Sequence, residues 1–534
     1  MIKKIIIVGG GSAGWMTAAT LSKFCSDKEI ILIESPNIPT VGVGESTLGQ
    51  INEWLSMMQI KDEDFMKHCN ATYKLSIRFQ DFGRLGDGGF HYPFGPSYIK
   101  GNKARLNDWY FKKILYPQTH NMDYAECMFP QMALVIQNRI SDKPNIVDGD
   151  WTFQKHVAYH FDATLFAGWL RDHICIPNKV KHVQEEIKTI EADYKKGIIS
   201  LNKKHKADLY IDCTGFKSLL LGKTLKEPFE SFDYLPNNSA WATKIPYRNI
   251  RNEFKNYTNC TAIQNGWIWT IPLWEKIGTG YVYSDKYVSD ADALKEFKHW
   301  LGYPTMQFHP LPPFFTDKKN KYNPNWPDQL EFKKIKFEGG MYKNAWVKNV
   351  CAIGLSSGFI EPLESNGLLA VHEYLHFLLR GLGRSEISQF TRDNFNYSAN
   401  KLCKGFAGFV GFHYALSSRT DTKYWRAIQE RTYPFDFNYP SLNNDFQRAV
   451  ISRVQNYSYD PEGGFNCIAT GLDWPATDLP TLMKYTSKST YAEFKKEWEE
   501  AINQLNKRKL KWLFNVSGCL SSRAFLNQKI YHDS

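Results

Sequence analysis

The feature that most constrains the fold is a glycine-rich turn near the N-terminus, Gly9-Gly10-Gly11-Ser12-Ala13-Gly14. An apolar run at residues 4–8 precedes it, and residues 15–24 after it have a helical composition. A second apolar run, residues 29–33, ends in Glu34. Glycines here let the backbone approach a pyrophosphate at the helix N-terminus, and the acidic residue can accept hydrogen bonds from ribose hydroxyls. The sequence therefore predicts a β-turn-α-β unit that binds a dinucleotide.

Two later segments decide which dinucleotide is expected. Residues 208–215 (DLYIDCTG) are similar to the strand and turn by which flavoproteins of the hydroxylase type hold the adenosine half of FAD. Residues 351–358 (CAIGLSSG) lie where such proteins bring a strand and loop under the flavin. An NAD domain needs neither segment, so the cofactor is predicted to be FAD. Contacts to it are predicted at Gly9, Gly11, Ser12, Ala13, Gly14, Glu34, Gly44, Glu45, Val183, Gly215, Leu355 and Leu368.

Composition limits the possible partners and compartments. None of the apolar stretches among the 534 residues reaches the roughly 18–20 residues of a membrane span. The ten cysteines are scattered singly, which is typical of a reducing, cytoplasmic compartment. The net charge of +11 comes from dispersed lysines without a nucleic-acid motif. We therefore expect a cytoplasmic protein with no nucleic-acid and no membrane partner.

The order of apolar segments predicts the fold class. A strand is expected at residues 207–212 and another at the start of 347–354, while alternating patterns at 267–272 and 278–283 favour an antiparallel sheet. Residues 367–382 are predicted to be a helix. The expected class is α/β: a Rossmann-like FAD-binding domain of the flavin hydroxylase type, an interwoven antiparallel sheet and a mainly helical C-terminal part.

The predicted domain organisation has two modules. Residues 1–385 form the FAD-binding module, in which about 84–150 and 225–340 contribute to the substrate side. Residues 386–534 form a mainly helical substrate-binding module. Without repeats or low-complexity linkers, the parts are expected to be interwoven.

Short motifs narrow the chemistry. Residues 266–272 (GWIWTIP) fit Gly-Trp-x-Trp-x-Ile-Pro, and residues 42–47 (GVGEST) fit Gly-x-Gly-Glu-[Ser/Ala]-Thr. Together with Trp15 after the glycine turn, they resemble flavin-dependent halogenases of the tryptophan-halogenase type. Residues 160–163 (HFDA) and 359–365 (FIEPLES) match as well, so the resemblance runs over most of the chain.

The resemblance implies an enzyme, its cofactors and its catalytic residues. In that family, FADH2 from a separate reductase, dioxygen and halide give hypohalous acid, which travels through a tunnel to a lysine beside an aromatic substrate. The segment 71–79 (ATYKLSIRF) places that lysine at Lys74, whose amine can aim an electrophilic halogen at one ring carbon. Glu364 matches the essential glutamate, which polarises the halogenating species or takes the ring proton. Asn366 and Gly367, at the expected helix start, are predicted to bind the halide.

The substrate pocket and tunnel are assigned by the same resemblance to His91, Phe94, Trp267, Trp269 and Ser365. On a strand the two tryptophans share a face, and they would keep organic substrate away from the flavin. Tryptophan-specific members carry a Phe-Trp pair before a segment like Cys467-Ile468, and residues 456–464 here lack it. The predicted substrate is therefore an electron-rich arene of the indole or phenol type, not necessarily free tryptophan.

Other interpretations are weighed against this one. A flavin-dependent aromatic hydroxylase is the main alternative, but it needs neither Lys74 nor the paired tryptophans. A non-enzymatic flavin-binding module fits poorly with Lys74 and Glu364 both present. Residues 372–376 (HEYLH) satisfy the zinc-protease pattern His-Glu-x-x-His, yet they fall on the helix after the flavin loop, so no metal is expected. A homo-oligomer remains compatible with the sequence.

Overall fold

The computed structural model describes residues 2–37, 45–98, 106–302, 313–433, 464–473 and 491–532. The predicted cofactor residue Gly44 and nearly all of the segment 456–464, on which the substrate argument rests, lie outside these ranges.

A six-stranded sheet contains the predicted β-turn-α-β unit. Strand β1 (Lys4–Val8) lies at its centre, α1 (Ser12–Phe24) follows the glycine turn, and β2 (Glu29–Glu34) pairs in parallel with β1. The strand order is β20-β21-β12-β1-β2-β9, and β20 is antiparallel to β21. The remaining strands are β9 (Lys181–Gln184), β12 (Leu209–Asp212), β20 (Trp346–Val347) and β21 (Val350–Ala352). The Rossmann-like prediction is confirmed, because the apolar strands β1, β2, β12 and β21 are parallel and buried at the middle of this sheet.

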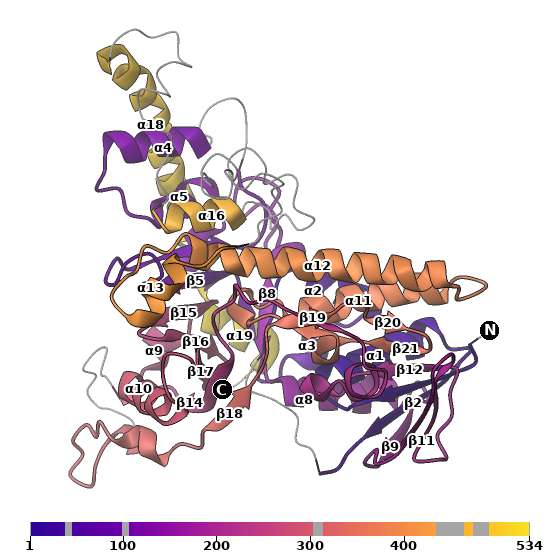
Figure 1. Ribbon diagram of the computed structural model, residues 1–534. Coiled ribbons are helices and arrows are strands. Elements are labelled where there is room, and N and C mark those ends of the chain that lie inside the picture. The colour runs from indigo at the N-terminus through magenta and orange to yellow at the C-terminus, as the bar shows by residue number, and fades with distance from the viewer. Residues whose placement is uncertain are drawn as a thin grey trace.

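The predicted second sheet has seven strands in the order β18-β14-β17-β16-β15-β5-β6. Most neighbours are antiparallel, but β15 and β5, which are far apart in the sequence, run parallel. In Figure 1 this sheet lies beside the nucleotide-binding sheet, and α12 spans both. Its strands are β5 (Ser76–Gln80), β6 (Gly89–Pro93), β14 (Ser239–Pro246), β15 (Tyr257–Ile263), β16 (Gly266–Pro272), β17 (Lys276–Tyr283) and β18 (Lys333–Lys336).

A small sheet joins these two parts and carries Lys74. Strand β8 (Ala158–Phe161) pairs with both β3 (Glu45–Ser46) and β4 (Thr72–Lys74). Leu75 alone separates β4 from β5 of the large sheet. Lys74 therefore lies at the junction of two sheets, where backbone pairing on both sides fixes its position.

Shorter strands complete the sheets. Strand β10 (Ile190–Asp193) pairs with β11 (Gly197–Leu201), and β7 (Arg139–Ile140) pairs with β23 (Leu520–Ser521). A three-stranded sheet contains β13 (Phe229–Ser231), β19 (Gly340–Tyr342) and β22 (Gly358–Phe359).

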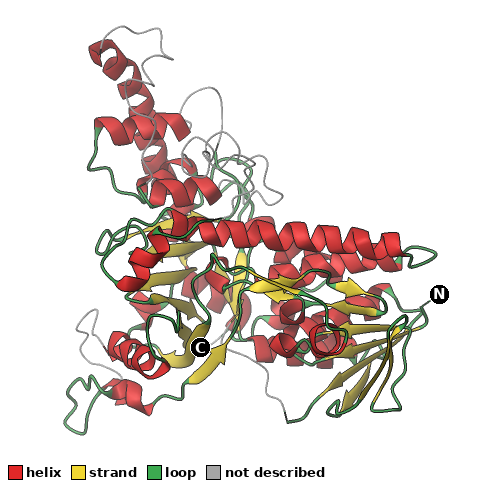
Figure 2. Cartoon of the chain, in the orientation of Figure 1, coloured by secondary structure: helices red, strands yellow, loops and turns green. Residues whose placement is uncertain are grey.

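The helices form a layer over the sheets and a second, separate group (Figure 2). Helix α11 (Gly367–Leu382) matches its prediction, and it packs against α1 and against α12 (Gln389–Ala415). The second group brings α18 (Tyr491–Val516) together with α4 (Leu106–Leu115), α5 (Asp123–Met128) and α6 (Met132–Ile136). The other α-helices of the described residues are α2 (Ile51–Met58), α3 (Asp62–Phe65), α7 (Phe153–His156), α8 (Ala163–Leu170), α9 (Ile250–Glu253), α10 (Asp290–Gly302), α13 (Lys423–Gln429), α16 (Gly464–Gly471) and α19 (Ser522–Leu526).

The expected module boundary near residue 385 falls between α11 and α12, two helices that pack together. The helical group also takes members from both sides of that boundary, since α18 contacts α4, α5 and α6. The division into residues 1–385 and 386–534 stays a prediction.

The last part of the chain supports the strand that carries Lys74. The ring of Tyr531 stacks on Trp274 with 3.9 Å between centroids and 5° between planes. Its hydroxyl donates to the carbonyl of Ala71, 2.8 Å away and three residues before Lys74. Both rings are buried, so this contact ties the chain end to the site by packing and by a hydrogen bond.

Replacing this ring should destabilise the whole fold. We expect Tyr531→Ala to lower the free energy of unfolding by about 3–5 kcal/mol, because it leaves an aromatic-sized cavity against Trp274. Urea unfolding followed by tryptophan fluorescence measures the loss. Tyr194→Ala, at a ring that is 90% exposed, is the control and should be near neutral. Equal midpoints for the two variants would contradict the packing argument.

Candidate functional site

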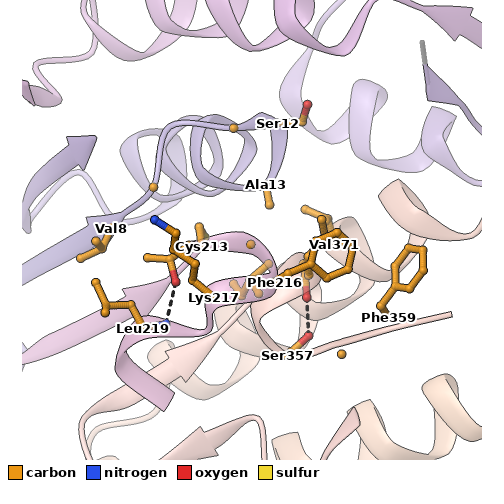
Figure 3. Close-up of a pocket in the computed structure, with 18 of the residues that line it drawn as sticks. Val8, Ser12, Ala13, Cys213, Phe216, Lys217, Leu219, Ser357, Phe359 and Val371 are labelled. Carbon is orange, nitrogen blue, oxygen red and sulfur yellow. Dashed lines mark hydrogen bonds between the residues drawn. The ribbon is translucent and has the colours of Figure 1, made fainter. Parts of the chain in front are cut away.

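A cavity of about 560 Å³ lies at the carboxyl ends of β1, β2, β12 and β21. In Figure 3 the side chains of Ala13, Phe216 and Val371 converge on it from three distant segments of the chain. This edge of a doubly wound sheet is where dinucleotides bind. The predicted cofactor and halide residues that line the cavity are Gly9, Gly11, Ser12, Ala13, Glu34, Gly215, Leu355, Asn366, Gly367 and Leu368.

The glycine turn has the close backbone approach that its sequence predicts. Gly9 has φ of +113°, and a Cβ built on it would lie 2.2 Å from the carbonyl oxygen of Cys213 at the end of β12. A Cβ on Gly14 would lie 1.9 Å from the carbonyl oxygen of Gly9. Gly14 is outside the cavity lining, and its role is to let α1 begin directly against the turn.

Glu34 closes one end of the cavity beside a residue that the sequence analysis missed. His182 Nε2 in β9 lies 2.7 Å from Glu34 Oε1, and this contact holds the carboxylate at the cavity edge. Two other predicted contacts are not among the lining residues and stay predictions: Val183 pairs with Ile33 in the sheet, and Glu45 pairs with Phe161. Residues 185–187, just after Val183, line the cavity instead.

The opposite end of the cavity is the start of α11. Asn366 caps this helix without a side-chain hydrogen bond, and its buried Nδ2 has no partner within the described ranges. The first backbone N–H groups of the 16-residue helix adjoin that amide. Glu34, the glycine cradle and this end of α11 together fit a dinucleotide with an anion beside it. The donor set thus suits FAD and halide.

Lys74 lies directly behind this end of the cavity. Its Nζ donates to Ser365 Oγ at 2.8 Å and to the carbonyl oxygen of Thr47 at 2.9 Å. The ring of Phe94 lies on another side, with 4.8 Å between Nζ and its centroid. Because Ser365 contacts Lys74 while Asn366 lines the cavity, two consecutive residues connect the predicted lysine with the predicted cofactor site.

Burial changes the protonation of this amine. The Lys74 side chain is fully buried, and desolvation lowers its pKa to about 7, although the nearby Cys260 and Glu364 oppose that shift. A lysine amine with a pKa near 7 is largely neutral in weakly alkaline solution and has a reactive lone pair.

Glu364 lies in the 3-10 helix η7 (Pro362–Glu364) and is also fully buried. His413 of α12 approaches it, with 2.7 Å between Nε2 and Oε1. Burial raises the pKa of Glu364, and the contacts with His413 and Lys74 oppose that shift.

The loop before Glu364 is anchored by a second buried carboxyl group, which the sequence analysis did not single out. Asn237 Nδ2 donates to Glu361 Oε2 at 2.7 Å and to the hydroxyl of Tyr414 at 2.9 Å. Burial raises the pKa of Glu361 to about 7. His413 and Glu361 escaped detection because their partners are far away in sequence.

The predicted tunnel residues surround the same region. Trp267 and Trp269 share one face of β16, and their rings meet edge to face with 6.3 Å between centroids. Gly280 on β17 makes room for Trp269, because a Cβ there would lie 2.1 Å from the indole ring. His91 Nδ1 lies 2.9 Å from Ser76 Oγ, and burial lowers the pKa of His91 to about 3, so its ring is neutral.

The zinc-like pattern lies on α11. His372 is buried, its ring centroid is 6.3 Å from that of His376, and its Nδ1 lies 3.4 Å from the adjacent Glu373. In the described part of the chain, groups of three or more His, Cys, Asp or Glu that could hold a metal are absent. A search of the same residues finds no helix with the length and apolarity to span a membrane.

Comparisons with known proteins agree with this geometry. The family model described as tryptophan halogenase matches residues 4–439. Tryptophan 6-halogenase ThaL of Streptomyces albogriseolus is 32% identical over 451 residues, which cover 80% of this chain and 79% of that protein. Tryptophan 7-halogenase RebH of Lentzea aerocolonigenes is 32% identical over 449 residues, with coverage of 80% and 79%.

Solved structures extend the similarity over nearly the full length. The apo structure of VirX1 has a TM-score of 0.86 at 37% identity and covers 99% of this chain and 100% of that one. The crystal structure of tryptophan 6-halogenase SttH from Streptomyces toxytricini has a TM-score of 0.80 at 29% identity, with coverage of 98% and 99%. The family model and these relatives show that the chain belongs to the tryptophan halogenase family and is a flavin-dependent halogenase, an enzyme that uses FADH2 and halide.

Proposed function

We propose that Lys74 is the residue that receives the halogen and delivers it to an aromatic substrate. The observation that supports this most strongly is the buried Lys74 amine, which has a pKa of about 7. It contacts Ser365, and the next residue, Asn366, lines the cofactor cavity. When bound, the reduced flavin supplies with dioxygen the oxidising equivalents that convert halide into hypohalous acid.

In the proposed transfer, residues of this chain account for every proton that moves. The Lys74 lone pair attacks the halogen of hypohalous acid, the N–halogen bond forms, and the hydroxyl group leaves as water with one amine proton. The arene carbon then takes the halogen, and the electrons of the N–halogen bond return to nitrogen. Glu364 in its acid form protonates that nitrogen, and its carboxylate then takes the ring proton, which restores aromaticity.

The remaining predicted residues shape access to this amine. Asn366 Nδ2 and the N-terminus of α11 hold the halide beside the cofactor. Trp267 and Trp269 form the tunnel wall that admits hypohalous acid and excludes the arene. Neutral His91 and the ring of Phe94 pack against the substrate.

The substrate is an electron-rich arene of the indole or phenol type, with no requirement for free tryptophan. The sequence departure before Cys467-Ile468 and the aromatic character of the described pocket support this class. Family membership implies an aromatic substrate and a separate flavin reductase that supplies FADH2. We place the enzyme in the cytoplasm, on the basis of its unpaired cysteines, and assign the 386–534 module to the substrate side.

An arene panel tests the function directly. The enzyme is supplied with FAD, a flavin reductase, NADH, oxygen and chloride, bromide or iodide in turn, and the products are read by mass spectrometry. Regioselective halogenation of indoles or phenols is expected. Hydroxylated products with every halide would instead support the aromatic hydroxylase alternative, and halogenation of free tryptophan alone would overturn the substrate class.

Removing the amine should separate oxidant formation from halogen transfer. For Lys74→Met we expect halogenated product below about 1% of the unmodified enzyme, because the nucleophile is gone. FAD binding and the rate of flavin oxidation should be unchanged. Lys23→Met, at a lysine at the far end of α1, is the matched control and should keep full halogenation. Regioselective product from the Lys74 variant would show that the amine is not the carrier.

The protonation of Lys74 should set the pH dependence. The groups that face it are Cys260 on β15, His160 on β8 and Glu364 in η7. Only the neutral amine attacks, so product per flavin oxidised should rise with pH through about 7 and then level off. Product and flavin oxidation are measured together across this range. A ratio that stays flat from pH 6 to pH 8 would contradict a titrating amine.

Loss of the Glu364 proton exchange should slow halogen transfer without changing the oxidant supply. We expect Glu364→Gln to reduce the single-turnover rate of arene halogenation by about 100-fold or more, as for a general acid-base group. A primary isotope effect with the ring-deuterated substrate should appear, because proton removal becomes slow. Rates equal to those of the unmodified enzyme would exclude this role for Glu364.

A further inference from the structure

A continuous line of buried hydrogen bonds leads from Lys74 to His160. After Lys74 donates to Ser365, the Ser365 hydroxyl donates to Ser46 Oγ at 3.2 Å. The oxygens of Ser46 and Thr258 are 2.7 Å apart, and Thr258 Oγ1 lies 2.9 Å from His160 Nε2. Every one of these side chains is buried. His160 opens the HFDA motif, for which the proposed mechanism has no use.

The far end of this line fixes its direction. The Thr72 hydroxyl lies 2.6 Å from the carbonyl oxygen of Pro272, and a carbonyl can only accept, so the one Thr72 hydrogen is committed there. His160 Nδ1, 3.1 Å from Thr72 Oγ1, must therefore carry a hydrogen and donate it. Burial holds the pKa of His160 well below its usual range, so the ring is neutral and Nε2 has only a lone pair.

The direction then passes from residue to residue. Nε2 of His160 accepts from the Thr258 hydroxyl, so Thr258 must accept from Ser46, and Ser46 in turn accepts from Ser365. Each hydroxyl has a single hydrogen, and each of these hydrogens is donated to the next residue in the direction away from Lys74. Ser365 can meet the amine only as an acceptor.

Lys74 is also the hydrogen-bond donor in its second contact. The carbonyl oxygen of Thr47 also accepts from Nζ. A neutral amine has two hydrogens and one lone pair, and these two acceptors use both hydrogens. Its lone pair is thus left for the halogen donor.

We propose that His160 and Thr258 are positioning residues for halogen transfer: they set the direction of the hydroxyl chain, and thereby keep the Lys74 lone pair unoccupied and oriented. This inference rests on the proposed role of Lys74 and deepens it. Without Thr258 as acceptor, the Ser46 hydroxyl turns towards Ser365. The Ser365 hydrogen then turns to the Lys74 lone pair and blocks it.

Two substitutions at Thr258 make opposite predictions for a hydrogen-bonding role and a packing role. Thr258→Val keeps the shape but removes the hydroxyl, and we expect product per flavin oxidised to fall about tenfold, the equivalent of one neutral hydrogen bond. Thr258→Ser keeps the hydroxyl and loses a methyl group, and it should retain close to full coupling. A packing role would spare the valine variant and harm the serine variant, which would overturn the proposal.

Thr261→Val is the matched control. Thr261 lies on the same strand, β15, three positions away and so on the opposite face, and its hydroxyl accepts from Asn259 outside the chain to Lys74. Its coupling should equal that of the unmodified enzyme. Thermal unfolding and FAD binding, measured for all three variants, show whether a loss of coupling is a loss of fold. A fall in coupling for Thr261→Val as large as for Thr258→Val would contradict the assigned path.

A spectroscopic readout tests the chain even if halogenation fails. In enzyme labelled with ¹⁵N-histidine, the resonances of His160, assigned by their loss in His160→Phe, should show a protonated Nδ1 and a bare Nε2. Thr258→Val should shift the Nε2 resonance, and Thr258→Ser should leave it in place. A protonated Nε2 would overturn the inferred direction. No halogenation by the unmodified enzyme would count against the proposed function alone.

Discussion

The arrangement of the site depends on the burial of the Lys74 amine. A buried ammonium group is costly, so burial favours the neutral form of Lys74, which is the form that the proposed halogen transfer needs. The backbone carbonyl of Thr47 and the hydroxyl of Ser365 replace the lost water for its two hydrogens. The junction of two sheets supplies the rigidity, because β4 and β5 fix the backbone on both sides of the amine.

Much of this could be predicted from the sequence, because the decisive signals are local. The glycine turn and Glu34 lie within one β-turn-α-β unit, so their spacing alone specifies the cradle. The alternation that puts Trp267 and Trp269 on one face is a property of a single strand. Lys74 could be assigned from a motif, although no periodicity points to it. Its hydrogen-bond partners could not be assigned from the sequence, because they come from distant segments.

The rest depends on contacts between distant segments, for which a single sequence contains no signal. His413 reaches Glu364 from a helix that begins 25 residues later, and Thr258 meets His160 across two sheets. Buried serines and threonines follow no spacing rule, so their hydrogen-bond partners are determined by the fold. The helical group likewise combines α4–α6 with α18, which composition alone assigned to separate parts of the chain.

Ser365 and Asn366 are neighbours that serve two different compartments. One contacts the amine of Lys74 and the other lines the cavity, so a single peptide unit connects the two sites. Ser365 has φ of +58°, a left-handed conformation that turns the chain between the two sides. The position of the amine relative to the cavity therefore depends on the conformation of one residue. Under the proposed function, capture of the oxidant by Lys74 would depend on this one turn of the main chain.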